Sequence, residues 1–150
     1  MDRVLLSFLV IILALFGLQS IDRTEGNCVN LYIDYGQLDN GKKINECIEI
    51  SDKTTALDIL QKTEIEIEGT KRYGLDVLCR INGLPNIKME SCDTMPSESA
   101  YWAIIVKERQ VLPFPRKEWG WSQFGITQQY LDKGDSIGFV FTENGKVRFP

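Results

Sequence analysis

The stretch "CVNLYIDYGQLDNGKKINECIEI", residues 28–50, sets the first part of the fold. Val29, Leu31 and Ile33 stand at alternate positions near its start, and isoleucines follow the same period near its end. Alternation with a period of two is typical of a strand that has one buried face. The Asn-Gly pair between the two halves can adopt positive φ, as a hairpin turn requires. The stretch therefore predicts two antiparallel strands joined by a turn.

Cysteines at both ends of this hairpin raise the question of disulfides. The chain has four, namely Cys28, Cys47, Cys79 and Cys92. Four cysteines allow three connectivities, and we favour Cys28–Cys47 with Cys79–Cys92 because each pair is local. Such a bridge typically contributes about 2–4 kcal/mol. A tight turn centred on the Asn-Gly pair would misalign Cys28 and Cys47, so this pairing requires a wide loop. The thiols are poor metal ligands here, because the chain has neither C-x-x-C nor histidine.

A helix is predicted within "SDKTTALDILQKT", residues 51–63. Thr55 followed by Asp58 three positions later matches a capping box. Leu57, Ile59 and Leu60 are expected to bury against the inner face of the sheet.

The rest of the chain reads mainly as strands and turns. Pro113 and Pro115 exclude a central strand from the long segment 109–130, and residues 85–99 read as a loop tied to its strand by Cys79–Cys92. Strands are expected at 64–70, 75–84, 100–108 and 136–141, with a final edge hairpin at 143–149. This order favours an α+β fold over residues 28–150: a β-grasp-like mixed sheet crossed by one main helix.

The N-terminus predicts export. Arg3 precedes an apolar run at 4–18, and Ser20 offers a small residue at the cleavage position. This pattern is typical of a secretory signal peptide, here residues 1–20, and the run is short for a bilayer span. Residues 21–27 then form a flexible lead. We expect a secreted protein; the alternative is a membrane anchor formed by an uncleaved leader.

Several function classes find no support. The formal charge of −4 and the scattered basic residues argue against a nucleic-acid partner. No histidine is available for a nucleophile–base pair, and strand alternation places Glu64, Glu66 and Glu68 on a solvated face. Asp34, Asp39 and Asn40 miss the spacing of a calcium-binding loop, while Asp132–Asp135 reads as a turn. We therefore expect a protein without cofactor, metal or catalytic residues.

The segment "KEWGWSQFGITQQY", residues 117–130, is dense in aromatic residues. Trp119 and Trp121 point to the same side if the segment is extended. Exposed indoles make good stacking surfaces for flat ligands, whereas buried ones would close one end of the core. Both interpretations stay open at the level of sequence. The tentative ligand-binding residues are Tyr101, Trp119, Trp121, Phe124 and Tyr130.

Four segments and a cysteine resemble a known family, in this order: "TTALDIL" (54–60), "GTKRYGLDVLCRINGLPN" (69–86), Cys92, "SAYWAIIV" (99–106) and "GITQQYLDKGDSIGFVF" (125–141). They resemble small secreted proteins related to the C-terminal β-domain of transcobalamin and intrinsic factor. The resemblance spans about two-thirds of the chain. The most specific parts are Gly69 to Cys79 and Ala100 to Trp102. It implies a β-grasp-like domain with an extracellular or surface role, and a corrinoid-like ligand.

By position, Tyr101 and Trp102 match the Tyr-Trp pair of that family, and Gly125 to Tyr130 match its following loop. We expect Trp102 in the core and Tyr101 nearer the surface. The predicted contact region is therefore Val111 to Tyr130 with Tyr101 beside it. Two functions follow: a non-enzymatic binding domain for a cobalamin-like or other flat apolar ligand, or a structural module that meets surface proteins.

Overall fold

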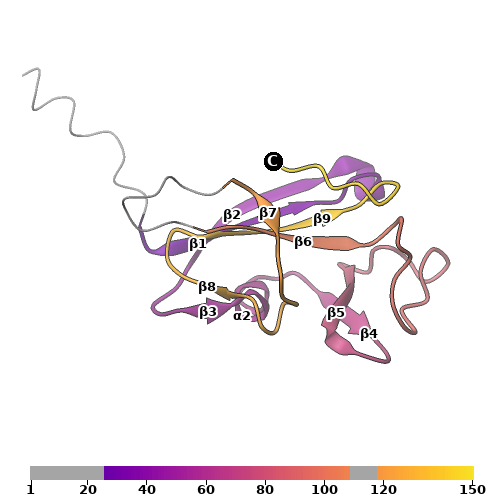
Figure 1. The fold of residues 1–150 in the computed structure, drawn as a ribbon, viewed down its shortest axis with the longest axis horizontal. Helices are drawn as coiled ribbons and strands as arrows, with labels where there is room; N and C mark the ends of the chain where they lie inside the picture. Colours follow the sequence, from indigo (N-terminus) through magenta and orange to yellow (C-terminus); the bar gives the residue numbers. More distant parts are fainter. Residues whose placement is uncertain (1–25, 109–117) are drawn as a thin grey trace, which may run out of the picture.

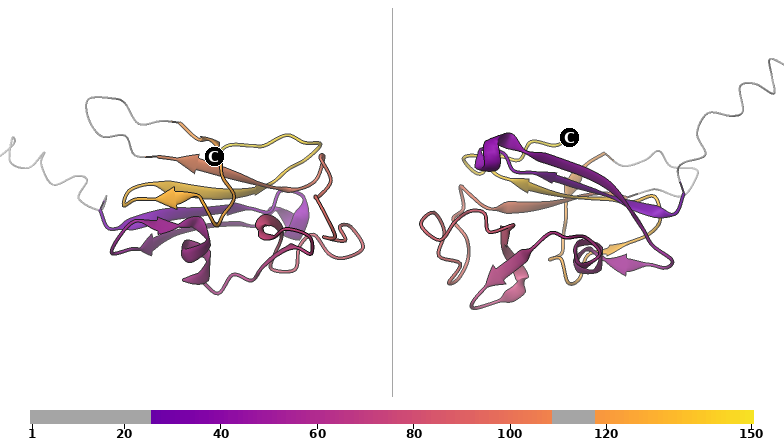
Figure 2. Two further views of the ribbon diagram at one scale, coloured as in Figure 1. Left: turned by 60° about the horizontal axis from the view of Figure 1, so that its bottom comes forward. Right: turned by 180° about the vertical axis from the view of Figure 1, so that it is seen from behind.

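A computed structural model describes residues 26–108 and 118–150. The predicted leader, most of the lead at 21–27, and residues 109–117 of the predicted contact region lie outside the described residues. The described chain forms two layers (Figures 1 and 2). One layer is a five-stranded sheet; the other holds the helix and two short two-stranded sheets.

The large sheet is mixed, with the strand order β2-β1-β9-β6-β7. Its first and last strands in the sequence, β1 and β9, are parallel neighbours, and every other pair is antiparallel. The strands are β1 (Cys28–Asp34), β2 (Lys43–Glu49), β6 (Trp102–Lys107), β7 (Gly120–Trp121) and β9 (Ser136–Phe141). The strand predicted at 136–141 is thus confirmed.

The β1–β2 hairpin has the wide loop that the cysteine pairing requires. A 3-10 turn, η1 (Leu38–Gly41), joins the strands, with positive φ at Asp39 and Asn40. This loop sets Cys28 opposite Glu49 and leaves Cys47 diagonal to Cys28, with their Cα atoms 5.5 Å apart. Both predicted disulfides, Cys28–Cys47 and Cys79–Cys92, are confirmed.

The helix α2 (Ala56–Gln61) is shorter than the predicted stretch. It is preceded by β3 (Thr54–Thr55), which pairs with β8 (Tyr130–Leu131). The capping box is confirmed, because the Thr55 hydroxyl accepts from the Asp58 N–H and the Asp58 carboxylate accepts from the Thr55 N–H.

The prediction of the buried helix face was wrong at one position. Ala56, Ile59 and Leu60 are fully buried, whereas Leu57 is only half-buried. Residues three and four positions apart share a helix face, so 56, 59 and 60 form the buried stripe and 57 falls beside it.

The hairpin of β4 (Ile67–Thr70) and β5 (Gly74–Ile81) stands apart from the large sheet. Its strands approach closely at Gly69, where a Cβ would come within 2.0 Å of the Gly74 carbonyl oxygen. The first strand is shorter than the predicted 64–70, because the backbone of Glu66 bonds the turn residue Asn82 instead. Glu64, Glu66 and Glu68 are exposed, as their alternation predicted.

The core lies between the two layers. Val29, Leu31 and Ile33 of β1 face it, together with Ile137, Phe139 and Phe141 of β9 and the helix residues. Trp102 also lies in this core with 4% of its surface exposed, and Tyr101 is half-buried, as predicted. The result is an α+β fold of mostly sheet, with two disulfides and, in the described ranges, a single α-helix.

The predicted edge hairpin at 143–149 does not extend the sheet. Asn144 and Gly145 make a tight turn that closes a single bridge between Glu143 and Lys146. The Gly145 N–H donates to the Ser99 carbonyl at 2.9 Å, so the turn packs against the segment before β6 rather than along a strand edge. Within the residues described, no helix has the length and apolar character needed to cross a bilayer.

Candidate functional site

The main candidate site is an apolar pocket of about 430 Å³ between the two layers. One wall comes from β5, in the layer of the helix and the two small sheets, and the other comes from the start of β6 in the large sheet. We call it the interlayer pocket. Its lining consists of Asp76, Val77, Leu78, Met95, Pro96, Ser97, Glu98, Tyr101, Trp102, Ile104, Phe124 and Gly125.

The Trp102 side chain that lines the pocket is held rigidly. Its ring meets Tyr35 edge-on at 5.2 Å and Phe141 at 5.4 Å between centroids. Its indole N–H donates to the Leu84 carbonyl at 2.9 Å, which satisfies the one polar group of the ring. The pocket therefore has one fixed aromatic surface.

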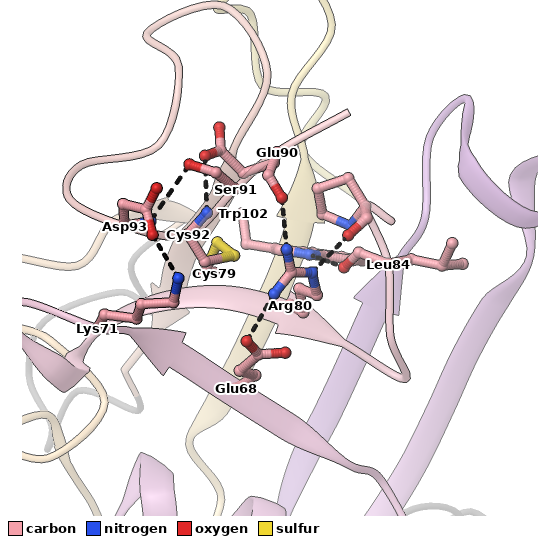
Figure 3. Close-up of polar contacts among 11 residues, drawn as sticks. Glu68, Lys71, Cys79, Arg80, Leu84, Glu90, Ser91, Cys92, Asp93 and Trp102 are labelled. Atoms are coloured by element: carbon pink, nitrogen blue, oxygen red, sulfur yellow. Dashed lines mark hydrogen bonds and ion pairs between the residues drawn. A yellow bond between two sulfur atoms is a disulfide. The ribbon is translucent and has the colours of Figure 1, made fainter. Parts of the chain in front are cut away.

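The 85–99 loop supplies the outer wall, and a buried arginine holds it in place (Figure 3). Arg80 of β5 is 6% exposed. Its Nε donates to the Pro85 carbonyl at 2.8 Å, and its Nη2 donates to the Glu90 carbonyl. Its Nη1 pairs with Glu68 across the hairpin at 2.6 Å. One guanidinium thus fastens both ends of a loop segment to the strand.

Further contacts fix the same loop (Figure 3). The Cys79–Cys92 disulfide ties it covalently to β5, and Lys71 pairs with Asp93 at 2.6 Å. In addition to the disulfide, the Glu90 carboxylate accepts hydrogen bonds from the N–H groups of Cys92 and Ser97. A loop of polar composition is therefore ordered, and it presents Met95 and Pro96 to the pocket.

The segment 122–129 supplies the remaining wall. A Cβ at Gly125 would meet the Asp76 carbonyl oxygen at 2.8 Å, so only glycine allows this approach to β5. The Thr127 hydroxyl donates to the Asp76 carboxylate at 2.6 Å. These contacts place the Phe124 ring at the mouth of the pocket, where 55% of it remains exposed.

The charged groups that line the pocket in the described part of the chain share one sign. Asp76 and Glu98 are both solvent-exposed carboxylates, and among the residues that the structure describes no lysine or arginine lines the cavity. The pocket thus offers a planar apolar surface with two anionic groups at its exposed side.

The structure brings together only some of the predicted site residues. Tyr101 and Phe124 line the interlayer pocket. Trp119 is half-buried on the opposite face of the large sheet, where it meets Tyr32 at 6.2 Å and covers Gly138. Its ring thus packs against the sheet and does not enter the pocket.

Trp121 and Tyr130 also lie outside the interlayer pocket. Trp121 pairs with Ile105, so it shares the sheet face of Trp119, as strand alternation predicted. It contacts Phe149 edge-on and shares a smaller pocket of about 240 Å³ with Phe124. Tyr130 is 56% exposed on β8, with the Lys53 ammonium 5.8 Å from its ring.

A second cleft of about 380 Å³ lies on the far face of the large sheet. Four of its charged side chains form two ion pairs, since Asp34 pairs with Lys43 at 3.2 Å and Arg148 pairs with Glu143. Burial and the Asp34 carboxylate raise the pKa of Tyr32, which donates to Asp34. The Asp34 hydrogen bond likewise raises the pKa of Lys43. Tyr32, Asp34 and Lys43 thus bond to one another within this cleft.

Sequence reasoning missed the 85–99 loop as part of a site. The signal was the predicted Cys79–Cys92 bridge, which places "TMPSES" (94–99) beside β5 and hence near Tyr101. Asp76 and Ile104 read only as strand residues. Among the residues that the structure describes, no cluster of three or more metal-ligating side chains occurs.

The chain was compared with protein-family models, with curated proteins and with solved structures, and no comparison gave a match.

Proposed function

We propose that this protein is an exported, non-enzymatic domain that binds a flat apolar ligand in the interlayer pocket. The observation that carries the proposal is the pocket itself: about 430 Å³, lined mainly by apolar and aromatic side chains on ordered elements. Pockets of a few hundred Å³ with few polar groups are the usual form of small-molecule sites.

Export is supported from two sides. Two disulfides indicate an oxidising environment. The sequence pattern at 1–20 is that of a signal peptide.

The β-grasp assignment and the resemblance to the transcobalamin β-domain belong to the same proposal. A parallel central pair made by the first and last strands, with a helix across one face, supports a β-grasp-like topology. The ligand suggested by that resemblance is a corrinoid, which would rest on the pocket mouth rather than enter it whole. This step is an argument by fold analogy.

The test is a titration followed by two-dimensional NMR of the 15N-labelled protein. The probes are 2-naphthylmethanol, as a neutral flat ligand, and hydroxocobalamin, as a corrinoid. Binding should shift the indole N–H of Trp102 and the amide of Gly125, because both residues line the pocket.

Two variants of matched exposure make the test specific. Phe124→Ala should weaken binding of 2-naphthylmethanol roughly threefold to tenfold, since one stacking partner contributes about 0.5–1.5 kcal/mol. Tyr130→Ala removes a ring of similar exposure that lies outside the pocket, and it should leave binding unchanged. Equal effects of the two variants, or no binding of any probe, would contradict the proposal.

The second candidate is a protein-interaction module. It is favoured by apolar side chains on the outer side of the 85–99 loop, where Ile87 is 75% exposed and Met89 is 61% exposed. This function predicts that no probe binds the pocket.

A further inference from the structure

The interlayer pocket combines aromatic rings with carboxylates of a single sign. Tyr101, Trp102 and Phe124 provide the rings, and Asp76 and Glu98 provide the charges. We propose that the pocket selects ligands that carry a cationic amine on the flat apolar body. This inference rests on the proposed binding function and names the chemical class of its ligand.

Contacts with neighbouring residues hold Asp76 in place. The Thr127 hydroxyl donates to Oδ1 at 2.6 Å, and Gly125 packs against the Asp76 backbone. One carboxylate oxygen, Oδ2, has no hydrogen-bond donor among the described residues. Asp76 belongs to the part of β5, residues 76–78, that lines the pocket, and Phe124 lines the same pocket.

Glu98 contributes a second carboxylate to the pocket. Unlike Glu68, Glu143 and Asp93, which pair with Arg80, Arg148 and Lys71, it forms no ion pair in the part of the chain that the structure describes. It follows Pro96 and Ser97 on the same wall of the pocket.

The rings favour the same charge. An ammonium group over an aromatic face is attracted by the negative face of the ring. A ligand carboxylate would meet two like charges and, within the described ranges, no basic lining residue; like charges in one site oppose each other. Rings and carboxylates together therefore discriminate by the sign of the ligand charge.

The experiment compares three probes that share one naphthyl body: 2-naphthylmethylamine (cationic at pH 7), 2-naphthylmethanol (neutral) and 2-naphthylacetate (anionic). Dissociation constants come from the NMR titration at low ionic strength, where charge interactions are least screened. The amine should bind roughly threefold to tenfold more tightly than the alcohol, as expected for exposed charge pairs. The acetate should bind more weakly than either.

Two double variants separate local from overall charge. Asp76→Asn with Glu98→Gln should abolish the preference for the amine, so that this variant binds the amine and the alcohol with similar affinity. Glu64→Gln with Glu66→Gln changes the net charge equally, on exposed residues outside the pocket, and should preserve the preference.

The outcomes distinguish the two proposals. Equal binding of all three probes, or loss of the preference in the Glu64/Glu66 variant, overturns the cation inference while the binding function stands. Failure of every probe to bind overturns both.

Discussion

Arg80 shows how a single residue can determine where a loop lies. Its guanidinium is nearly inaccessible, yet two of its three partners are loop carbonyls rather than acids. A buried charge is tolerated only when it is paired and hydrogen-bonded. Here the Glu68 carboxylate supplies the pair, and the 85–99 loop supplies the remaining acceptors. Because the buried guanidinium needs these acceptors, the loop must stay close to β5.

Replacing this arginine should therefore destabilise the protein. Arg80→Met leaves the buried Pro85 carbonyl and the partly buried Glu90 carbonyl without this donor, and an unsatisfied buried group costs about 1–3 kcal/mol. We expect the free energy of unfolding to fall by roughly 2 kcal/mol or more, as measured by urea denaturation with the disulfides intact. Arg148→Met is the control: its surface pair with Glu143 should contribute less than about 1 kcal/mol. Similar losses in both variants would refute this role of Arg80.

Gly138 and Trp119 illustrate a second effect at the residue scale. A Cβ at Gly138 would meet the Ile105 side chain at 2.7 Å and the Trp119 ring at 3.2 Å. The missing side chain thus leaves room for the indole on the sheet surface. The sequence allowed Trp119 either a place in the core or a role in ligand binding, and this packing against the sheet accounts for its position.

At the scale of elements, the short helix depends on its N-terminal cap. Six residues are too few for a stable isolated helix, so capping and tertiary burial must both contribute. The Thr55 side chain satisfies the Asp58 N–H, and hydrogen bonds from Thr55 lower the pKa of the Asp58 carboxyl below its usual 3.8.

Thr55→Ala should lower the free energy of unfolding by about 0.5–2 kcal/mol at pH 7, as for other N-cap losses. Asp58→Asn adds a test of pH dependence. A carboxyl whose pKa is lowered by folding stabilises the folded state at pH values above its unfolded pKa. That contribution disappears as the pH falls below 3.8 and through the lower pKa of the folded state. The stability difference between wild type and Asp58→Asn should thus be largest near pH 7 and shrink below about pH 4. A difference that stays constant down to pH 2 would exclude this contribution.

At the scale of the whole molecule, the two disulfides have different positions relative to the pocket. Cys28–Cys47 joins β1 and β2, and β2 lies three places from β6 in the sheet order. Cys79–Cys92 joins β5 to the loop that carries Met95 and Glu98. Only the second bridge bears directly on the pocket wall.

Removing each bridge by a double serine substitution should therefore separate stability from binding. Both variants should lose about 2–4 kcal/mol of unfolding free energy. Under conditions where both stay folded, the Cys79/Cys92 variant should bind 2-naphthylmethylamine several-fold more weakly, because its wall loop opens locally. The Cys28/Cys47 variant should bind as wild type does. NMR titration measures both; unchanged binding in the Cys79/Cys92 variant would show that the loop is held without its disulfide.

The sequence by itself determined the local features of this protein. Alternation predicted β1 and β2, further strands were predicted where β5 and β9 lie, the Thr55–Asp58 spacing predicted the cap, and the local cysteine spacing favoured the observed bridges. These features depend on neighbours within a few residues or on one adjacent strand, so the pattern of side chains carries them directly.

Only the tertiary structure decided where the aromatic residues and the pocket lie. Tyr101 and Phe124 are 23 positions apart in the sequence, and Met95 comes from a loop with no periodic pattern. They meet because Arg80, a disulfide and the close approach at Gly125 fold distant segments onto one strand. Such contacts depend on which layers pack together and on the distance between them. Hydrophobic periodicity shows which face of an element is buried, but it does not determine that distance.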